Sequence, residues 1–340
     1  MAKQLIDYKA FNLVEIKNLF NKKNLLAFSA QADSTCLFFL LIANNIHFDI
    51  AIVNYNTRIQ SIDEINYAKD LAKEFNKKIF ICNATIAKSN FENNAREIRF
   101  NFFKEIIKSN NYDNLILANQ LNDRMEWLLM QLCKGCGLNT LLGFDTISIY
   151  DNFSMVRPLG ITSRLEIINF LKKNNIKYFV DETNKEDRFL RNFFRKNYTN
   201  SLIEYFSDGI IKSFQYLKID FDALFNNKLV NVENIFFYKK TNQEVINIHY
   251  IDIASKKCGY ITSYKQKQEI LKSNYSCVIG GKIIIDCNDE HIFITNNTNS
   301  KKHDKAFRNI LRIYKIPPKI RPFITKDSLN LIDCELKNYK

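Results

Sequence analysis

Residues 25–41, LLAFSAQADSTCLFFLL, decide the fold, because they read as an apolar strand, a short polar turn and an apolar helix. Amides at the start of such a helix carry partial positive charge and bind anions, so the turn is a candidate phosphate loop. Phosphate loops normally use glycine, which permits close backbone approach or a positive φ. This turn has none, and the first glycine is Gly135. The alternative is an ordinary helix start capped by Asp33 and Ser34.

The first half of the chain repeats this alternation of strand and helix patterns. Short apolar runs predict strands, and apolar residues at three- and four-residue spacing predict helices. The alternation favours an α/β fold, in which helices cover both faces of a parallel sheet. The predicted strands are 25–28, 48–54, 78–82 and 114–118, and the predicted helices are 33–45, 61–75, 91–109 and 121–134.

The pattern becomes irregular after Gly143, and alternating segments after Asn231 predict a small β-containing domain. We therefore expect one domain at 1–205, followed at 206–340 by a helical connection and a small α+β domain. The elements predicted in this half are helices at 164–173, near 187–205 and at 208–227, and strands at 282–286 and 291–295.

The composition narrows the classes of function. The 340 residues carry a net charge of +13, which favours a polyanionic partner, nucleic acid before a membrane surface, over a merely lysine-rich surface. No apolar run approaches the roughly 18 residues of a membrane span, and the N-terminus lacks the apolar core of a signal peptide, so a cytoplasmic protein is expected.

The C-x-x-C motif at Cys133 and Cys136 is not expected to bind zinc, because the sequence has no second cysteine pair at a suitable spacing.

Polar clusters follow three of the predicted strands, at 29–34, 54–58 and 119–123. Ligands of parallel sheets bind beyond the carboxyl ends of the strands, where these clusters meet. Turns between strand and helix are often polar for no functional reason. The convergence of three clusters nevertheless predicts a binding site at this rim of the sheet.

Two further groups in the first 205 residues have side chains suited to chemistry. Asp123 and Glu126 lie three residues apart on one helix face, which suits a divalent metal or an ammonium group, or a solvated surface. Arg191 and Arg195 lie on one face of a predicted helix, which suits phosphate contact or an ordinary amphipathic helix.

Residues 301–323, KKHDKAFRNILRIYKIPPKIRPF, interleave eight Lys and Arg residues with Phe307, Tyr314 and Phe323. Basic and aromatic side chains together are what RNA contact requires. The same pattern fits an amphipathic helix that packs on its own domain, so both interpretations stand.

Taken in order, these motifs resemble the tRNA(Ile)-lysidine synthetases, within the PP-loop (N-type) ATP pyrophosphatases. The chain departs from that family at its loop, where Ala30 and Gln31 replace glycines, and where Tyr55 and Asn119 replace histidines. The matching segments are 29–34 (SAQADS), 53–58 (VNYNTR), 94–100 (NAREIRF), 117–126 (LANQLNDRME), 134–138 (KGCGL), 157–159 (RPL), 181–184 (DETN), 191–195 (RNFFR), 316–318 (IPP) and 321–322 (RP).

The resemblance implies an RNA-modifying ligase. Its PP-loop nucleotide-binding catalytic domain would be residues 1–205, and its small tRNA-binding domain would lie within 206–340. ATP would adenylate the C2 oxygen of the wobble cytidine in a CAU anticodon, and the ε-amine of free L-lysine would displace AMP. The implied partners are tRNA(Ile), lysine, ATP and Mg²⁺, without a membrane, zinc or an iron–sulfur cluster, and a homodimer is an open alternative. A catalytically impaired tRNA-binding relative is the second hypothesis, because the loop glycines are replaced. If the family's loop has a positive φ at the position of Gln31, the conformation would cost about 1–2 kcal/mol here, and a bulkier side chain would block the phosphate.

The resemblance also implies residue roles. Asp33 would hold Mg²⁺ and the pyrophosphate, Asp123 and Glu126 would receive the lysine ammonium or help to deprotonate it, and Arg191 and Arg195 would stabilise phosphate charge. The expected ATP-binding residues are Ser29, Ala30, Gln31, Ala32, Asp33, Ser34, Asn54 and Arg58, and the expected lysine or tRNA contacts are Arg96, Arg99, Asn119, Lys301, Lys302, Arg308, Arg312, Lys315 and Arg321.

Overall fold

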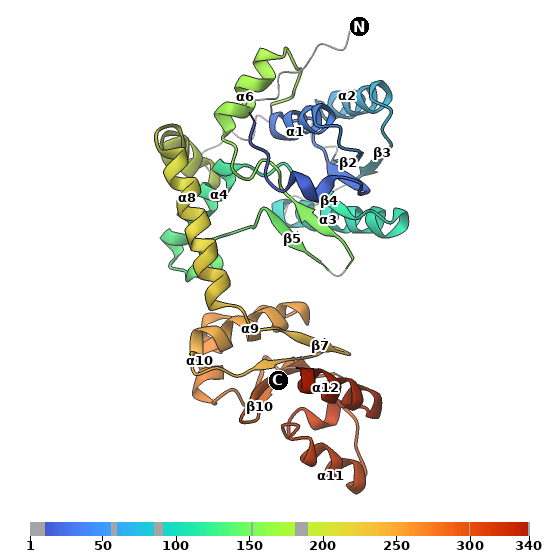
Figure 1. Cartoon of the computed structure of the whole chain (residues 1–340), viewed down its shortest axis with the longest axis vertical. Helices are drawn as coiled ribbons and strands as arrows, with labels where there is room; N and C mark the ends of the chain where they lie inside the picture. The colour runs from blue at the N-terminus through green and yellow to red at the C-terminus, as the bar shows by residue number, and fades with distance from the viewer. Residues whose placement is uncertain are drawn as a thin grey trace. The chain divides into compact units, whose positions relative to one another are not determined.

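The computed structural model describes residues 11–55, 60–84, 91–150, 152–180, 190–298 and 300–338. The chain divides into two compact units, Met1–Lys218 and Ile219–Lys340, and each unit has its own sheet and its own apolar cores (Figure 1). No helix in the described ranges has the length and apolar character needed to cross a bilayer.

The described part of the first unit holds a six-stranded sheet in the order β3-β2-β1-β4-β6-β5. All neighbouring pairs are parallel except β5 and β6, which are antiparallel. This confirms the mostly parallel α/β sheet that the sequence predicts. The strands are β1 (Asn24–Ala27), β2 (Asp49–Asn54), β3 (Ile79–Asn83), β4 (Asn114–Ile116), β5 (Ile147–Ile149) and β6 (Ser154–Val156).

Helices cover both faces of this sheet because successive strand residues point to opposite sides. Leu26 joins the core beneath α1, α2 and α6, which surrounds Phe38, whereas its neighbour Leu25 joins the core beneath α3, which holds Phe103 (Figure 1). The helices of this unit are α1 (Ala32–Ala43), α2 (Gln60–Glu74), α3 (Phe91–Asn110), α4 (Leu121–Lys134), α5 (Leu138–Leu141), α6 (Arg164–Lys173), α7 (Leu190–Phe194) and α8 (Asn200–Leu224), with a short 3₁₀ helix at Ile16–Leu19.

The strand order decides where the polar rim predicted from the sequence lies. β1 pairs with β2 on one side and with β4 on the other, so the chain reverses its direction of winding between β1 and β4. Connections that leave two such neighbours diverge and open a crevice at the carboxyl ends of the strands. The segments that follow β1 and β4, residues 28–31 and 117–120, therefore meet at this point.

Two features of the first unit differ from the sequence prediction. β5 and β6 were not predicted, because strands of three residues are too short to show an alternating pattern. The second is a π-helical turn, Arg195–Thr199, which joins α7 to α8. The predicted break between the helices near 187–205 and at 208–227 is present as a kink, because Phe206 inside α8 has non-helical backbone angles (φ −132°, ψ 21°).

The second unit is built on a five-stranded antiparallel sheet in the described residues, ordered β7-β8-β11-β10-β9. Alternate residues enter two cores: Phe236 and Tyr238 pack with α9 and α10, whereas Phe237 packs with α11 and α12. The strands are β7 (Val230–Val232), β8 (Ile235–Lys239), β9 (Cys277–Ile279), β10 (Ile283–Cys287) and β11 (His291–Asn296), and the helices are α9 (Glu244–Lys257), α10 (Tyr264–Lys272), α11 (Lys305–Ile313) and α12 (Lys326–Asn338), with a 3₁₀ helix at Arg321–Phe323.

A buried histidine lies in the core of this second unit. The His249 ring lies 3.9 Å from the Phe225 ring between centroids, and it is 7% exposed. Burial lowers the pKa of His249 to about 4, and Asp252 only partly offsets this effect. Lys256 and Lys267 lower the pKa further. The folded unit therefore holds this imidazole neutral.

We expect the second unit to lose stability in acid through His249. Unfolding returns the pKa to about 6.5, so this contribution is complete above pH 6.5 and falls by up to about 3 kcal/mol as the pH drops to about 4. His249→Phe retains an aromatic ring but removes the titration. Urea unfolding of the full chain at several pH values, followed by circular dichroism, should show a weaker acid loss in the variant. Equal losses in both proteins would contradict the assignment.

Candidate active site

The turn after β1 adopts a left-handed conformation at Ala30, where φ is +59°, and the Ala30 side chain is fully buried. Gln31 has φ −80° and ψ 169°, which is ordinary extended backbone, and it precedes the first turn of α1. The strain expected at Gln31 therefore falls on Ala30 instead. A methyl group there costs about 1–2 kcal/mol relative to an unstrained backbone.

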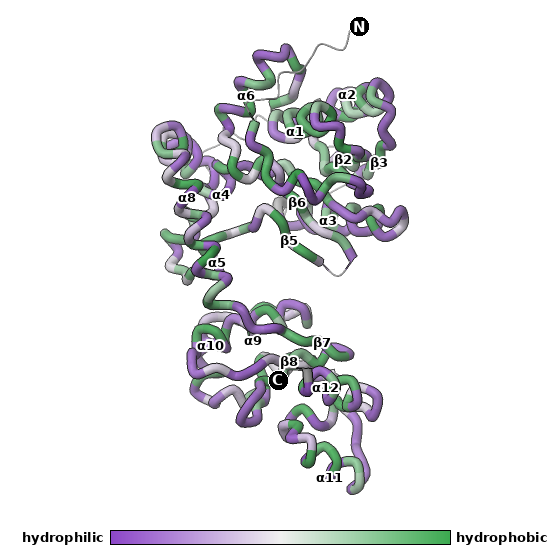
Figure 2. The backbone as a smooth tube through the Cα atoms, in the orientation of Figure 1, coloured by the Kyte–Doolittle hydropathy of each residue, from purple (hydrophilic) through white to green (hydrophobic). Residues whose placement is uncertain are grey.

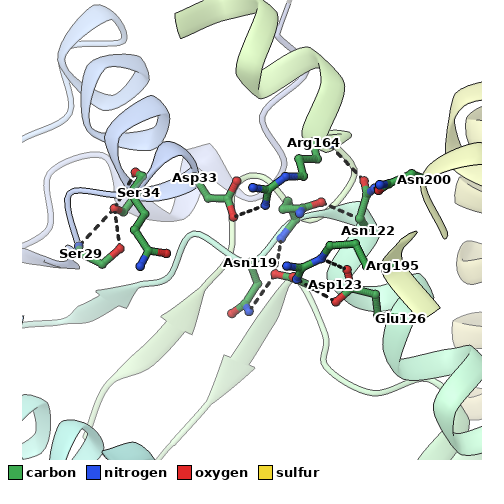
Figure 3. A network of polar contacts seen from close by, with 12 residues as sticks. Ser29, Asp33, Ser34, Asn119, Asn122, Asp123, Glu126, Arg164, Arg195 and Asn200 are labelled. Atoms are coloured by element: carbon green, nitrogen blue, oxygen red, sulfur yellow. Dashed lines mark hydrogen bonds and ion pairs between the residues drawn. The ribbon is translucent and has the colours of Figure 1, made fainter. Parts of the chain in front are cut away.

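Hydrogen bonds stabilise this turn, which lacks the glycines that phosphate loops normally use. Ser34 Oγ accepts from the Ser29 backbone N–H at 3.2 Å, lies 3.1 Å from Ser29 Oγ, and donates to the Gln31 carbonyl at 3.2 Å (Figure 3). The Phe179 N–H donates to the Ala30 carbonyl at 2.9 Å, which ties the turn to the segment after α6. Ser34 therefore cross-links the loop instead of capping the helix.

Asp33 lies in the first turn of α1, and one of its carboxylate oxygens accepts no hydrogen bond from the described residues. Its Oδ2 lies 3.9 Å from Arg164 Nη1, and its buried Oδ1 has no hydrogen-bond partner among the residues that the structure describes. Burial, followed by the charge of Asp123, raises the pKa of Asp33 to about 6, against the opposing effect of Arg164. A carboxylate in this position fits a divalent cation that arrives with an anion at the helix start.

The start of α4 orients a second carboxylate. Gln120 Oε1 accepts from the Asn122 N–H at 2.7 Å, while Asp123 Oδ2 accepts from the Gln120 N–H at 3.2 Å, which is a capping box. Asn119 Nδ2 also donates to Asp123 Oδ2 at 3.3 Å. One Asp123 oxygen is thus occupied by its own helix start.

Two arginines engage both predicted carboxylates. Glu126 is fully buried, with Arg191 Nε and Arg195 Nε each 2.6 Å from one of its oxygens. Arg191 Nη2 also lies 2.6 Å from Asp123 Oδ1. The predicted sharing of a helix face is present, and so is the clustering of the four predicted side chains. The sequence did not predict that the arginines pair with these carboxylates, because the partners lie 65 or more residues apart.

Asn122 ties α4 to two other elements and was missed by sequence reasoning. The residue is 3% exposed, and its side-chain amide donates to Asn200 Oδ1 at 3.1 Å and accepts from the Arg164 backbone N–H at 3.0 Å (Figure 3). The S-x-x-E pattern of Ser163 and Glu166 marks the start of α6 and could have placed Arg164 at its first position.

The remaining predicted residues of the first unit lie at the end of β2, in the segment that follows it, or on α3. Asn54 Nδ2 donates to Asn83 Oδ1 at 3.2 Å, at the ends of two neighbouring strands. Burial raises the pKa of Tyr55, and Arg99 partly offsets this rise. Arg96 stacks over the Phe100 ring at 5.0 Å. The predicted residue Arg58 and the motif at 181–184 lie outside the described residues.

Five of the six basic residues predicted in the second unit line one groove of about 540 Å³. On α11, Phe307 and Leu311 are buried, and polar and apolar residues alternate along this helix (Figure 2). Lys315 lies apart from the groove lining, 3.6 Å from Glu290. No acidic residue within the described chain lines the groove, so it suits an anion. Its lining is Lys301, Lys302, His303, Arg308, Arg312, Pro318, Arg321 and Pro322.

Comparisons with known proteins agree with this arrangement. Residues 6–202 match the PP-loop domain family. The chain is 42% identical over 309 residues to the tRNA(Ile)-lysidine synthase of Helicobacter pylori, which covers 90% of each protein. It is 39% identical to that of Wolinella succinogenes, over 93% of this chain and 96% of the relative. The corresponding Campylobacter jejuni protein is 40% identical, over 93% and 97%.

Glycine substitutions should distinguish the two replaced loop positions. Ala30→Gly relieves the left-handed strain, whereas Gln31→Gly relieves no strain and adds freedom to the unfolded chain. We expect Ala30→Gly to be more stable than Gln31→Gly by about 1 kcal/mol. Urea unfolding of the full-length variants measures this difference. Equal stabilities, or a more stable Gln31→Gly, would show that the backbone strain lies elsewhere.

Proposed function

The chain belongs to the tRNA(Ile)-lysidine synthase family, and we propose that it uses ATP to join L-lysine to the wobble cytidine of tRNA(Ile). The protein is a tRNA-modifying ligase with an ATP-binding PP-loop domain. The observation that carries the finer proposal is the meeting of the 29–34 loop with the Asp123–Glu126–arginine cluster at the rim between β1 and β4.

The proposed reaction has two steps. The C2 oxygen of the cytidine attacks the α-phosphorus of ATP, so an O–P bond forms and pyrophosphate leaves. The neutral ε-amine of lysine then attacks C2, a C–N bond forms, and the C2 oxygen leaves with AMP. The amine must lose its proton before it can attack, and the site must balance phosphate charge in both steps.

The α1 start is the proposed phosphate site. The backbone amides at a helix N-terminus attract anions, and the partnerless oxygen of Asp33 fits Mg²⁺ that accompanies ATP. The described residues contain no cluster of three or more potential metal-ligating side chains. That suits Mg²⁺, which is usually held by one or two carboxylates together with substrate phosphates. When bound, this ion would neutralise phosphate charge.

Asp123 is the proposed lysine-binding carboxylate, and the exposure of its arginine partner supports this choice over Glu126. Arg191, which pairs with Asp123, has a half-exposed side chain, whereas Glu126 is fully buried between two arginines. An incoming lysine ammonium could replace Arg191 on Asp123 with little desolvation. Arg191 would then be available to phosphate, while the Glu126–Arg195 pair keeps α4 and the following helical run together.

The groove of the second unit is the proposed contact for tRNA phosphates. Five cations line it without an acidic neighbour in the described chain. Burial and the nearby Arg312 lower the pKa of Arg321, so an anion that binds beside this guanidinium stabilises its charged form. Phosphate contacts of this kind supply affinity without sequence selectivity.

Incorporation of labelled lysine into tRNA(Ile) with a CAU anticodon tests the catalytic proposal. We expect ATP-dependent incorporation, none into the same tRNA with a GAU anticodon, and a loss on the order of 10²-fold in Asp123→Asn. If neither the natural chain nor the double variant Ala30→Gly, Gln31→Gly incorporates lysine while tRNA still binds, the protein is a non-catalytic tRNA-binding relative.

Binding of tRNA at several salt concentrations tests the groove. Arg308→Ala and Arg312→Ala should each weaken binding and reduce the slope of log affinity against log salt by about 1. Lys315→Ala is the matched control, since it removes a charge from the same segment outside the groove lining. A slope that falls equally in the control would show that the groove has no particular role.

A further inference from the structure

We infer that Arg164 is a phosphate-binding residue of the ATP site, which pairs with Asp33 until the nucleotide arrives. The inference rests on the proposed function, because it assigns a role in the same site. Sequence reasoning placed no function on this arginine. Three observations carry it: a fixed backbone, a side chain that reaches the loop, and a weak existing partner.

The backbone of Arg164 is held firmly. Ser163 and Glu166 form a capping box at the start of α6, with reciprocal hydrogen bonds of 3.2 and 2.7 Å. The Arg164 N–H itself donates to the buried Asn122 amide at 3.0 Å. Its Cα is therefore fixed relative to α4 as well as α6, which limits the loss of entropy when the side chain binds a ligand.

The side chain extends from α6 toward the start of α1, where Asp33 lies (Figure 3). Arg164 Nη1 is 3.9 Å from Asp33 Oδ2, which is an ion pair without hydrogen-bond geometry. Within the described chain, no side chain or carbonyl accepts a hydrogen bond from this guanidinium. Its side chain is 31% exposed, so a ligand can reach its donors.

Phosphate is the ligand that satisfies this arrangement. The guanidinium presents five N–H donors in a planar fork that matches phosphate oxygens, and the α1 amides attract the same anion. Without ATP, Arg164 offsets the charge of Asp33, which would otherwise repel a polyphosphate. With ATP, the arginine exchanges the loose carboxylate contact for phosphate contacts, and Asp33 becomes available to the cation that accompanies them.

Calorimetric binding of ATP and of adenosine to the full chain tests the inference. A charged hydrogen bond is worth about 1.5–3 kcal/mol, so Arg164→Ala should weaken ATP binding by about 10- to 150-fold. Adenosine binding and tRNA binding should not change, and Arg164→Lys should recover part of the ATP affinity. Lys172→Ala, in the last turn of α6, removes the same charge as a matched control. Equal losses for ATP and adenosine, or no loss for ATP, would overturn the inference.

A second measurement isolates the exchange between partners. With inorganic pyrophosphate as the probe and no added metal, Asp33→Asn should strengthen binding severalfold, because it removes a repulsive carboxylate and frees the arginine. Adding Arg164→Ala to that variant should abolish the gain. A gain that persists would mean that Arg164 does not contact the anion.

The outcomes also separate this inference from the proposed function. If ATP binding depends on Arg164 but the protein never incorporates lysine, the proposed reaction is overturned and the arginine assignment stands. If Arg164→Ala instead incorporates lysine at the natural rate and binds ATP with the natural affinity, the arginine assignment is overturned and the proposed reaction stands. A natural chain that binds neither ATP nor pyrophosphate would overturn the inference directly.

Discussion

The buried carboxylate of Glu126 is the interaction on which the site depends. A fully buried charge is costly unless it is paired and hydrogen-bonded, and here Arg191 and Arg195 supply that pairing. The pair forces the helical run from α7 through the π turn to lie against α4. π turns occur often at functional sites, and this one follows directly after α7, with Arg195 as its first residue. In the Arg191–Asp123 contact of the same cluster, the arginine side chain is half-exposed.

The candidate phosphate loop keeps a left-handed backbone position although the glycine that usually occupies such a position is absent. The backbone still turns through a left-handed residue, but Ala30 takes that position and Ser34 holds it with hydrogen bonds. The contact between Phe179 and the Ala30 carbonyl adds a support that is remote in the chain. The methyl group of Ala30 is small enough to be fully buried at this point of the turn.

Much of the fold was predictable, and the failures have physical causes. The bounds of α4 and α6 match their predictions because capping residues and helical periodicity agree there. The short strands β5 and β6 and the π turn carry no periodic signal of their own. Arg164 and Asn122 were missed because their contacts join distant parts of the chain, which no local pattern records. The Arg164 N–H bonds Asn122 across 42 residues, and the Arg164 guanidinium lies beside Asp33.

The sequence by itself determined the alternation of strand and helix, the polar rim, the basic C-terminal segment and the family resemblance, since each is written in local order and spacing. Only the tertiary structure decided which charges meet. It paired Asp123 and Glu126 with arginines, moved the backbone strain from Gln31 to Ala30, and set Arg164 beside Asp33. The reason is physical: periodicity reports which side of an element is buried, whereas ion pairs and backbone strain depend on distances between elements that packing alone sets.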